Sequence, residues 1–177
     1  MIEKAVTIFG TGRAKAGDSA YRLAYETGRL LAQAGFTIVN GGYGGTMLAA
    51  AKGASEAGGE VIGVTCSAFK RSTANQYITR EIVTESLDER LDTLIRLGQA
   101  YVVLGGGTGT LLELAKVWEF KNKGFLEAHK AIILVGRYWK PLIDLVASDD
   151  HDSINCLKIT DGPEQAAKLI AEIWIRD

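Results

Sequence analysis

Two charged residues in predicted helices lie beside apolar faces that should cover a core, and they are the first candidates for chemistry. Successive helical residues are about 100° apart, so the apolar side chains of Leu87–Leu97 share one arc, on which Arg90 is the only charged residue. In the helix expected to begin at Thr110, Glu113 also projects beside the larger apolar group. The two apolar groups are Leu87, Leu91, Leu94, Ile95 and Leu97 in the first helix and Leu111, Leu114, Val117, Trp118 and Phe120 in the second. An acid and a guanidinium placed together could bind an anion and stabilise a developing positive charge.

Each of these charges also has an interpretation without function. Thr110 and Glu113 have the S/T-x-x-E spacing of a helix capping box. Arg90 beside a core face is costly unless it is paired, and Glu113 or a backbone carbonyl could be its partner. Both residues, however, lie near the first turn of helices that follow predicted strands, which places them at the edge of a sheet where ligands bind.

Three glycine-rich loops are predicted at that same edge. They are Gly10-Thr11-Gly12 after the first strand, Gly41-Gly42-Tyr43-Gly44-Gly45 after the second, and Gly105-Gly106-Gly107-Thr108-Gly109-Thr110 after the fifth. Glycine lets backbone N–H groups approach an anion closely, and a helix N-terminus adds a favourable dipole. One such loop also fits a tight turn, but three on one edge favour an anion-binding site.

The common phosphate-binding motifs fit this chain poorly. A P-loop needs Gly-Lys followed by Ser or Thr, and the sequence has no Gly-Lys pair. A dinucleotide fingerprint needs a third glycine near Lys15 and an acidic residue at the end of the second strand, where this chain has Asn40. NAD is therefore not an expected ligand.

Short apolar runs alternate with amphipathic patterns along the whole chain. Predicted strands are Ala5–Phe9, Phe36–Asn40, Glu60–Thr65, Thr79–Thr84, Tyr101–Leu104, Ala131–Val135 and Cys156–Thr160. Predicted helices are Ser19–Ala34, Thr46–Ala57, Leu87–Leu97, Thr110–Asn122, Trp139–Ala147 and Pro163–Trp174. The alternation predicts a single α/β domain over residues 1–177, a Rossmann-like, doubly wound and mostly parallel sheet of about seven strands with helices on both faces.

Composition narrows the class of partner. Lys and Arg number 20 against 21 Asp and Glu, so the net charge is −1, and neither nucleic acid nor a membrane surface is an expected partner because both select a basic face. Met1–Lys4 leads directly into a predicted strand with no signal peptide, and Cys66 and Cys156 lack the spacing of a zinc or redox motif. We therefore expect a cytoplasmic protein with free thiols and no metal site.

Residues 106–113 carry a more specific pattern. Gly106, Gly107, Gly109, Thr110 and Glu113 read Gly-Gly-x-Gly-Thr-x-x-Glu, which resembles the signature of the LONELY GUY (LOG) family. Members of that family are cytokinin-activating phosphoribohydrolases, often labelled "possible lysine decarboxylase". Supporting matches within residues 5–145 are the Gly10-Thr11 loop, the segment from Gly41 to Met47, Gly58–Val64, Trp118 and His129-Lys130.

The resemblance implies hydrolysis of the N-glycosidic bond of a nucleoside 5′-monophosphate, AMP or a cytokinin nucleotide, to give free base and ribose 5-phosphate. It implies that Arg90 and Glu113 are catalytic, the same two residues that helix periodicity selects. The residues expected to bind substrate and its phosphate are Gly10, Thr11, Gly42, Gly106, Gly107, Thr108, Gly109 and Thr110. The family further implies a homodimer or higher homo-oligomer with sites near the interface, and the reaction requires no metal and no cofactor.

Three positions depart from the pattern of the LOG family. Pro usually precedes Gly106, where this chain has Gly105; Lys usually follows the catalytic Arg, where it has Leu91; and Gly-Leu-Met of the second loop is Gly45-Thr46-Met47. The Gly105–Thr110 loop is also similar to loops of relatives that bind a nucleotide or the molybdenum cofactor without hydrolysing it. A non-catalytic carrier of such a ligand is therefore the alternative function, and a purely structural assembly protein is a third.

Overall fold

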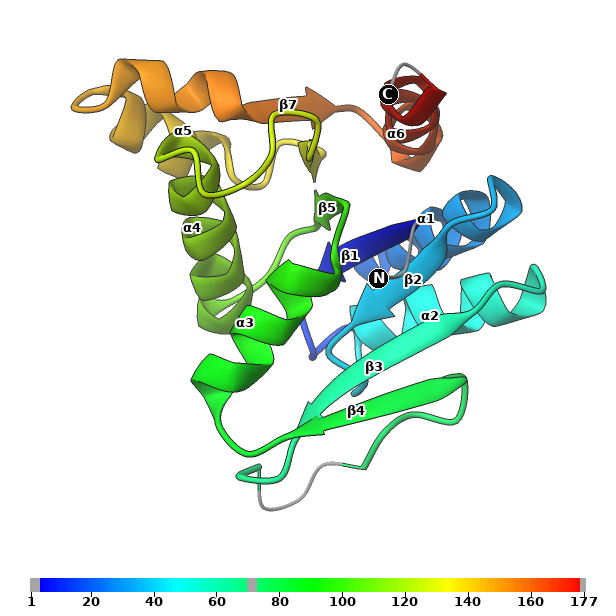
Figure 1. The fold of residues 1–177 in the computed structure, drawn as a ribbon. Coiled ribbons are helices and arrows are strands. Elements are labelled where there is room, and N and C mark those ends of the chain that lie inside the picture. Colours follow the sequence, from blue (N-terminus) through cyan, green and yellow to red (C-terminus); the bar gives the residue numbers. More distant parts are fainter. Residues whose placement is uncertain (1–3, 70–72, 176–177) are drawn as a thin grey trace.

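Short apolar runs of the sequence form the strands of one sheet, and the amphipathic runs between them form the helices that cover it (Figure 1). The structure, a computed structural model, describes residues 4–69 and 73–175. The strands are β1 (Ala5–Phe9), β2 (Thr37–Asn40), β3 (Val61–Cys66), β4 (Arg80–Thr84), β5 (Ala100–Val103), β6 (Ile132–Val135) and β7 (Leu157–Thr160). The helices are α1 (Ser19–Gln33), α2 (Thr46–Glu56), α3 (Leu87–Leu97), α4 (Thr108–Asn122), α5 (Lys140–Ala147) and α6 (Pro163–Ile175), with a 3₁₀ helix, η1 (His151–Cys156), before β7.

The seven strands of the described chain are all parallel and lie in the order β4-β3-β2-β1-β5-β6-β7. The predicted Rossmann-like α/β domain is confirmed, and its sheet is wholly rather than mostly parallel. The strand order reverses between β1 and β5, which pair from Val6 with Ala100 to Phe9 with Val103. Ligands bind such sheets outside the carboxyl ends of the strands at this reversal, so the loops after β1 and β5 define the place to look for a site.

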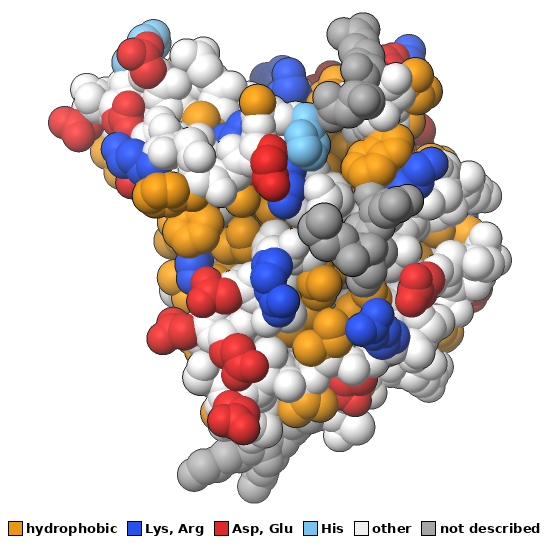
Figure 2. All heavy atoms as spheres, viewed as in Figure 1, with side chains coloured by type: hydrophobic (Ala, Val, Ile, Leu, Met, Phe, Trp, Pro, Cys, Tyr) orange, Lys and Arg blue, Asp and Glu red, His pale blue; other side chains and the backbone are white. Residues whose placement is uncertain are grey.

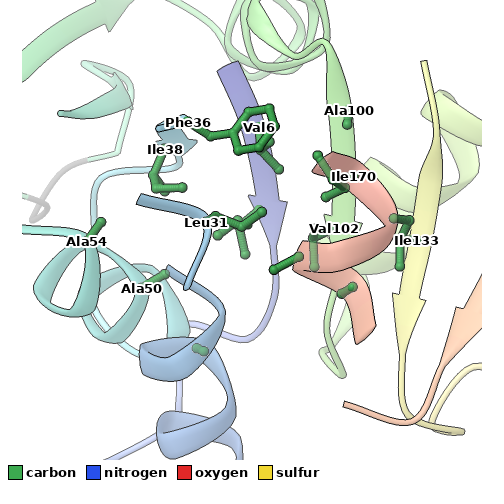
Figure 3. Close-up of a cluster of buried hydrophobic side chains, with 14 of the residues drawn as sticks. Val6, Leu31, Phe36, Ile38, Ala50, Ala54, Ala100, Val102, Ile133 and Ile170 are labelled. Atoms are coloured by element: carbon green, nitrogen blue, oxygen red, sulfur yellow. The ribbon is translucent and has the colours of Figure 1, made fainter. Parts of the chain in front are cut away.

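Alternating side chains of the central strand β1 enter two separate core clusters. Val6 and Ile8 pack with residues of α1, α2 and α6, whereas Ala5 and Phe9 pack with residues of α3, α4 and α5. Figure 3 shows the first cluster, with Leu31 of α1 beside Val6. Because both faces of the sheet are covered, its central strands are mostly apolar, and the buried hydroxyl of Thr7 in β1 donates to the Leu94 carbonyl (2.9 Å).

The start of α3 agrees with the sequence. Ser86 Oγ accepts a hydrogen bond from the Glu89 N–H (3.2 Å), and the Glu89 carboxylate accepts one from the Glu85 N–H (2.8 Å). Ser86 and Glu89 thus form a capping box, with its return bond made to the residue before the cap. This cap fixes the first turn of α3, which carries Arg90.

The start of α4 differs from the sequence prediction. The helix begins two residues earlier than expected, its N-cap is Gly107, and no side chain accepts a hydrogen bond there, so the predicted capping box of Thr110 and Glu113 is absent. The prediction that Leu87 and Leu111 lie on buried faces is also wrong, since they are 44% and 36% exposed. Both are in the first turn of their helix, at the rim of the sheet, where the apolar face no longer has strands beneath it. η1 was not predicted.

Helices α1 and α2 contact each other through their backbones. A Cβ atom on Gly28 would overlap the carbonyl of Ala50, and a Cβ atom on Gly53 would overlap the carbonyl of Tyr25. Two glycines in helix interiors weaken each helix in isolation, but here they allow an approach that no other residue permits. The pair braces the strands β1 and β2 from which two of the glycine-rich loops emerge.

We expect the substitution Gly28→Ala to lower the free energy of unfolding by about 2–3 kcal/mol, because the added methyl group forces the two helices apart. Gly109→Ala is the matched control: it is also a helical glycine, its Cβ would meet nothing within 4 Å, and it should gain about 0.5–1 kcal/mol from helix propensity. Urea denaturation followed by circular dichroism measures both. Equal stabilisation by the two substitutions would contradict the close helix contact.

The surface agrees with a small, nearly balanced charge. On the face shown in Figure 2, acidic and basic side chains are interspersed and no continuous basic area is seen. None of the helices in the described ranges is long and apolar enough to cross a membrane. Leu111 and Leu112 of α4 are exposed on this single chain, and the homo-oligomer that would cover them stays a prediction.

Candidate functional site

A cavity of about 800 Å³ opens at the carboxyl edge of the sheet, where β1 and β5 end. It is lined by the loops after these two strands, by the first turns of α3 and α4, by Tyr43 and Met47 from the second glycine-rich segment, and by Tyr138 after β6. Every predicted site residue except Gly42 lines it. The topology thus gathers into one cavity residues that are more than 100 positions apart in the sequence.

A second cavity of about 800 Å³ lies at the opposite edge of the sheet, among Phe120, Leu126 and Trp174. Its buried cation, Lys130, is already paired with Glu127 at 3.1 Å. It contains no glycine-rich loop and none of the predicted site residues. The first cavity is therefore the better candidate for a functional site.

The loop after β5 ends in the N-terminus of α4, which faces the cavity without a side-chain cap. The first N–H groups of a helix have no partner within the helix, so they are available to an anion and add the positive end of the helix dipole. Gly106 lies against the buried side chain of Thr110, and a Cβ atom on Gly106 would overlap the Thr110 hydroxyl. The loop therefore folds tightly onto its own helix, as an anion-binding turn requires.

The loop after β1 is fixed to both of the other loops. The Thr11 N–H donates to the Gly105 carbonyl (3.2 Å), and the Thr11 carbonyl accepts from the backbone N–H and the hydroxyl of Thr46 (2.9 and 3.0 Å). Gly10 has no room for a side chain, because its Cβ would lie 2.5 Å from the Thr46 hydroxyl. These bonds hold the floor of the cavity in one conformation.

Gly42 belongs to the turn that supports the cavity rather than to its lining. It has a left-handed φ of 77°, its N–H donates to Asn40 Oδ1 (2.8 Å), and its carbonyl accepts from the Asn75 N–H (2.8 Å). Asn40 Nδ2 also donates to the Met47 carbonyl (3.1 Å). Asn40 thus organises the loop through both ends of its side-chain amide.

Arg90 is held in the cavity by contacts on several sides. Although charged, it is only 7% exposed, and its Nε donates to the Val64 carbonyl (2.8 Å). Its guanidinium carbon lies 5.5 Å from the centre of the Tyr43 ring and 5.8 Å from that of Phe69, within the range of a cation–π contact. Gly41 must lack a side chain, because a Cβ there would overlap the Arg90 guanidinium. The surrounding protein therefore fixes both the position and the plane of this group.

Glu113 lies next to Arg90 in the lining of the cavity, with its Oε1 3.7 Å from Arg90 Nη1. At this distance the two charged groups form an ion pair, but they are too far apart for a direct hydrogen bond. The Glu113 side chain is 14% exposed. Burial raises the pKa of its carboxyl group to about 7, and the charge of Arg90 partly opposes this rise. Near neutral pH the group therefore exchanges a proton readily, as an acid or base in an active site does.

Two of the departures from the LOG pattern have structural explanations. Leu91 is 3% exposed, packs in the core and does not line the cavity. Gly105 lies under the ring of Tyr138, where a Cβ atom would come within 3.0 Å of that ring.

Several cavity residues were not predicted from the sequence as parts of a site. Phe69 and Tyr138 come from the connections after β3 and β6, and only the fold brings them to this edge. Arg13, exposed in the loop after β1, adds a positive charge to the lining. The ring of Tyr43 lies by Arg90, and its hydroxyl accepts a hydrogen bond from the Cys66 N–H (2.7 Å). No group of three or more metal-ligating side chains occurs within residues 4–69 and 73–175.

The strand order and the glycine-rich loop at a helix N-terminus define a Rossmann-like protein of the nucleotide-binding class. The chain belongs to the SLOG cluster4 family, whose sequence profile matches residues 3–164. The resemblance to the LOG enzymes is thereby confirmed as kinship within the wider SLOG superfamily, while the particular family is cluster4.

Similar proteins include both enzymes and cofactor-binding proteins. The cytokinin riboside 5′-monophosphate phosphoribohydrolase of Rhodococcoides fascians is 28% identical over 146 residues, which cover 81% of this chain and 74% of that one. A protein of the same name from Mycobacterium tuberculosis is 36% identical over 116 residues, 64% of this chain and 60% of that one. The structure of the molybdenum cofactor binding protein of Rippkaea orientalis matches with a TM-score of 0.79 at 27% identity and covers 96% of both chains.

The raised pKa of Glu113 predicts how stability depends on pH. Because the folded state binds this proton more tightly than the unfolded state, the stabilisation is complete below about pH 4.5 and is lost as the pH rises through about 7. Glu113→Gln has no group to titrate at this position, so it does not lose this stabilisation. The free energy of unfolding of the variant minus that of the natural chain should therefore rise by about 3 kcal/mol between pH 4.5 and pH 8.

Urea denaturation at several pH values measures this difference. Glu119→Gln is the matched control for removing one carboxylate, because Glu119 is on the same helix with its side chain 56% exposed. The same pH trend in both variants would show that burial of Glu113 is not its cause.

Proposed function

We propose that the chain is a nucleoside 5′-monophosphate phosphoribohydrolase that acts on AMP or a cytokinin nucleotide. The observation that carries the proposal is the buried pair of Arg90 and Glu113, which shares one cavity with a glycine-rich loop at the N-terminus of α4. The similarity to two named phosphoribohydrolases supports it. The cavity volume of about 800 Å³ is in the range of small-molecule sites and suits a nucleotide.

In this proposal the 5′-phosphate is bound by backbone N–H groups from Gly106 to Thr110. These groups and the dipole of α4 attract a dianion without a neutralising side chain in the loop itself. Thr11 and Gly10 fix the loop from the other side, and Arg13 adds positive charge at the mouth of the cavity. The phosphate thus anchors the ribose, so that its C1′ atom meets the acidic side of the cavity.

At that side Glu113 and Arg90 serve the chemistry. As the bond between C1′ and the base nitrogen breaks, positive charge develops on the ribose, and the Glu113 carboxylate stabilises that charge and orients the attacking water. The water oxygen adds to C1′, and a proton from the water passes to the departing base. Arg90, held by Val64 and two rings, balances negative charge on the base or on the phosphate without moving.

A second candidate function is binding without hydrolysis. It is favoured by the match along 96% of both chains to a molybdenum cofactor binding protein. A glycine-rich loop, a cationic wall and a cavity of about 800 Å³ serve a carried cofactor or nucleotide as well as a substrate. The two functions differ in one respect: a carrier returns its ligand intact, whereas a hydrolase releases free base.

Incubation of the purified protein with AMP, followed by chromatography, is expected to yield adenine and ribose 5-phosphate. We expect Glu113→Gln and Arg90→Ala each to lower kcat by about 10²-fold or more, because each removes charge stabilisation from the transition state. Circular dichroism confirms that the variants remain folded. A protein that binds AMP and never releases adenine would exclude the hydrolase and favour the carrier.

The pH profile of hydrolysis tests the protonation state of Glu113. Because the carboxylate is the active form and its pKa is about 7, kcat/KM should fall as the pH drops through 7, and it should reach a plateau above that value. Arg90 lowers this pKa, so any residual activity of Arg90→Ala should show the same fall at a higher pH. Activity that increases as the pH falls below 7 would contradict a carboxylate role.

A further inference from the structure

Two neighbouring aromatic residues after β6 hold the segment that enters the glycine-rich loop. The Tyr138 hydroxyl donates to the Gly106 carbonyl (2.9 Å), and Trp139 Nε1 donates to the Leu104 carbonyl (2.9 Å). The two rings contact each other edge to face, with their centres 5.0 Å apart. The connection between β6 and α5 thereby fixes the path of a loop that begins at β5.

The hydrogen bond from the Tyr138 hydroxyl also sets the direction of a backbone N–H group in the loop. In a trans peptide the carbonyl of one residue and the N–H of the next point in opposite directions. By fixing the Gly106 carbonyl, the Tyr138 hydroxyl therefore orients the Gly107 N–H, at the N-cap of α4 and in the lining of the cavity. Within the described residues this N–H donates to no acceptor of the protein itself.

The ring of Tyr138 explains why position 105, the residue before Gly106 in the loop, is glycine. A Cβ atom on Gly105 would lie 3.0 Å from Cγ and 3.1 Å from Cδ2 of the ring, closer than ordinary van der Waals contact. Any larger residue at this position would push the ring away from the loop. Tyr138 as a residue is 62% exposed, so removing its ring opens no part of the core.

We propose that Tyr138 is a positioning residue of the phosphate-binding loop: its hydroxyl fixes the peptide between Gly106 and Gly107 so that the Gly107 N–H is presented to a phosphorylated sugar. The inference rests on the proposed function in taking a phosphorylated sugar as the ligand. It does not depend on hydrolysis, since a phosphate is bound by the same N–H groups in a carrier.

Tyr138→Phe tests the hydroxyl while keeping the ring. We expect its affinity for ribose 5-phosphate, measured by titration calorimetry, to fall about 5-fold, as the loss of one orienting hydrogen bond implies. Its affinity for adenosine, which has no phosphate, should be unchanged. With AMP, KM should rise by the same factor while kcat is retained. Tyr25→Phe is the matched control, because it removes a hydroxyl that donates to Glu56 (2.6 Å) away from the cavity.

A second pair of variants tests the ring. Gly105→Ala alone should displace Tyr138 and weaken ribose 5-phosphate binding as Tyr138→Phe does. In the background of Tyr138→Ala, the change Gly105→Ala should have no further effect, because nothing remains to be displaced. Additive losses in this double-mutant cycle would count against the contact.

The outcomes separate this inference from the proposed function. If Tyr138→Phe binds ribose 5-phosphate as tightly as the natural chain does, the positioning role is overturned. It is also overturned if the variant loses affinity for adenosine by the same factor as for ribose 5-phosphate. If the natural chain binds ribose 5-phosphate but releases no adenine from AMP, hydrolysis is excluded. The comparison of the Tyr138 variants then still decides whether Tyr138 positions the phosphate-binding loop. A natural chain that does not bind ribose 5-phosphate overturns both.

Discussion

The buried charge of Arg90 is the constraint around which the cavity is organised. A guanidinium removed from water is strongly destabilising unless carbonyls, rings or a carboxylate replace its hydration. Here Val64, Tyr43 and Glu113 supply these contacts, and Gly41 makes the necessary space. These partners come from β3, α4 and the loop after β2, so the position of one side chain depends on the correct assembly of much of the sheet.

Much of the fold follows from patterns that short stretches of sequence carry. The alternation of apolar runs and amphipathic helices predicted each strand within a residue or two, and the parallel sheet followed from that alternation. Helix periodicity also selected Arg90 and Glu113, because a charged side chain beside an apolar helix face needs a partner or a function. The start of α4 was misjudged because Thr110 and Glu113 have the spacing of a capping box, whereas the cap is Gly107.

The rest of the site depends on contacts between distant segments. Phe69 and Tyr138 have no spacing that relates them to Arg90 or to the glycine-rich loop, and only the strand order brings them there. Gly42 illustrates the opposite case, since its place in a glycine-rich loop suggested a binding role, but its N–H bonds to Asn40 and its carbonyl to Asn75. Sequence patterns identify residues of unusual chemistry better than they identify those residues' neighbours.

The raised pKa of Glu113 has a consequence for any anion that enters the cavity. Negative charge brought close to a carboxyl group raises its affinity for a proton further, so the complex takes up protons from the surrounding buffer as it forms. The measured heat of association then changes with the ionisation enthalpy of the buffer. Such an anion associates more tightly in mildly acidic solution, whereas a reaction that needs the carboxylate proceeds faster in alkaline solution, so occupancy and turnover have different optima.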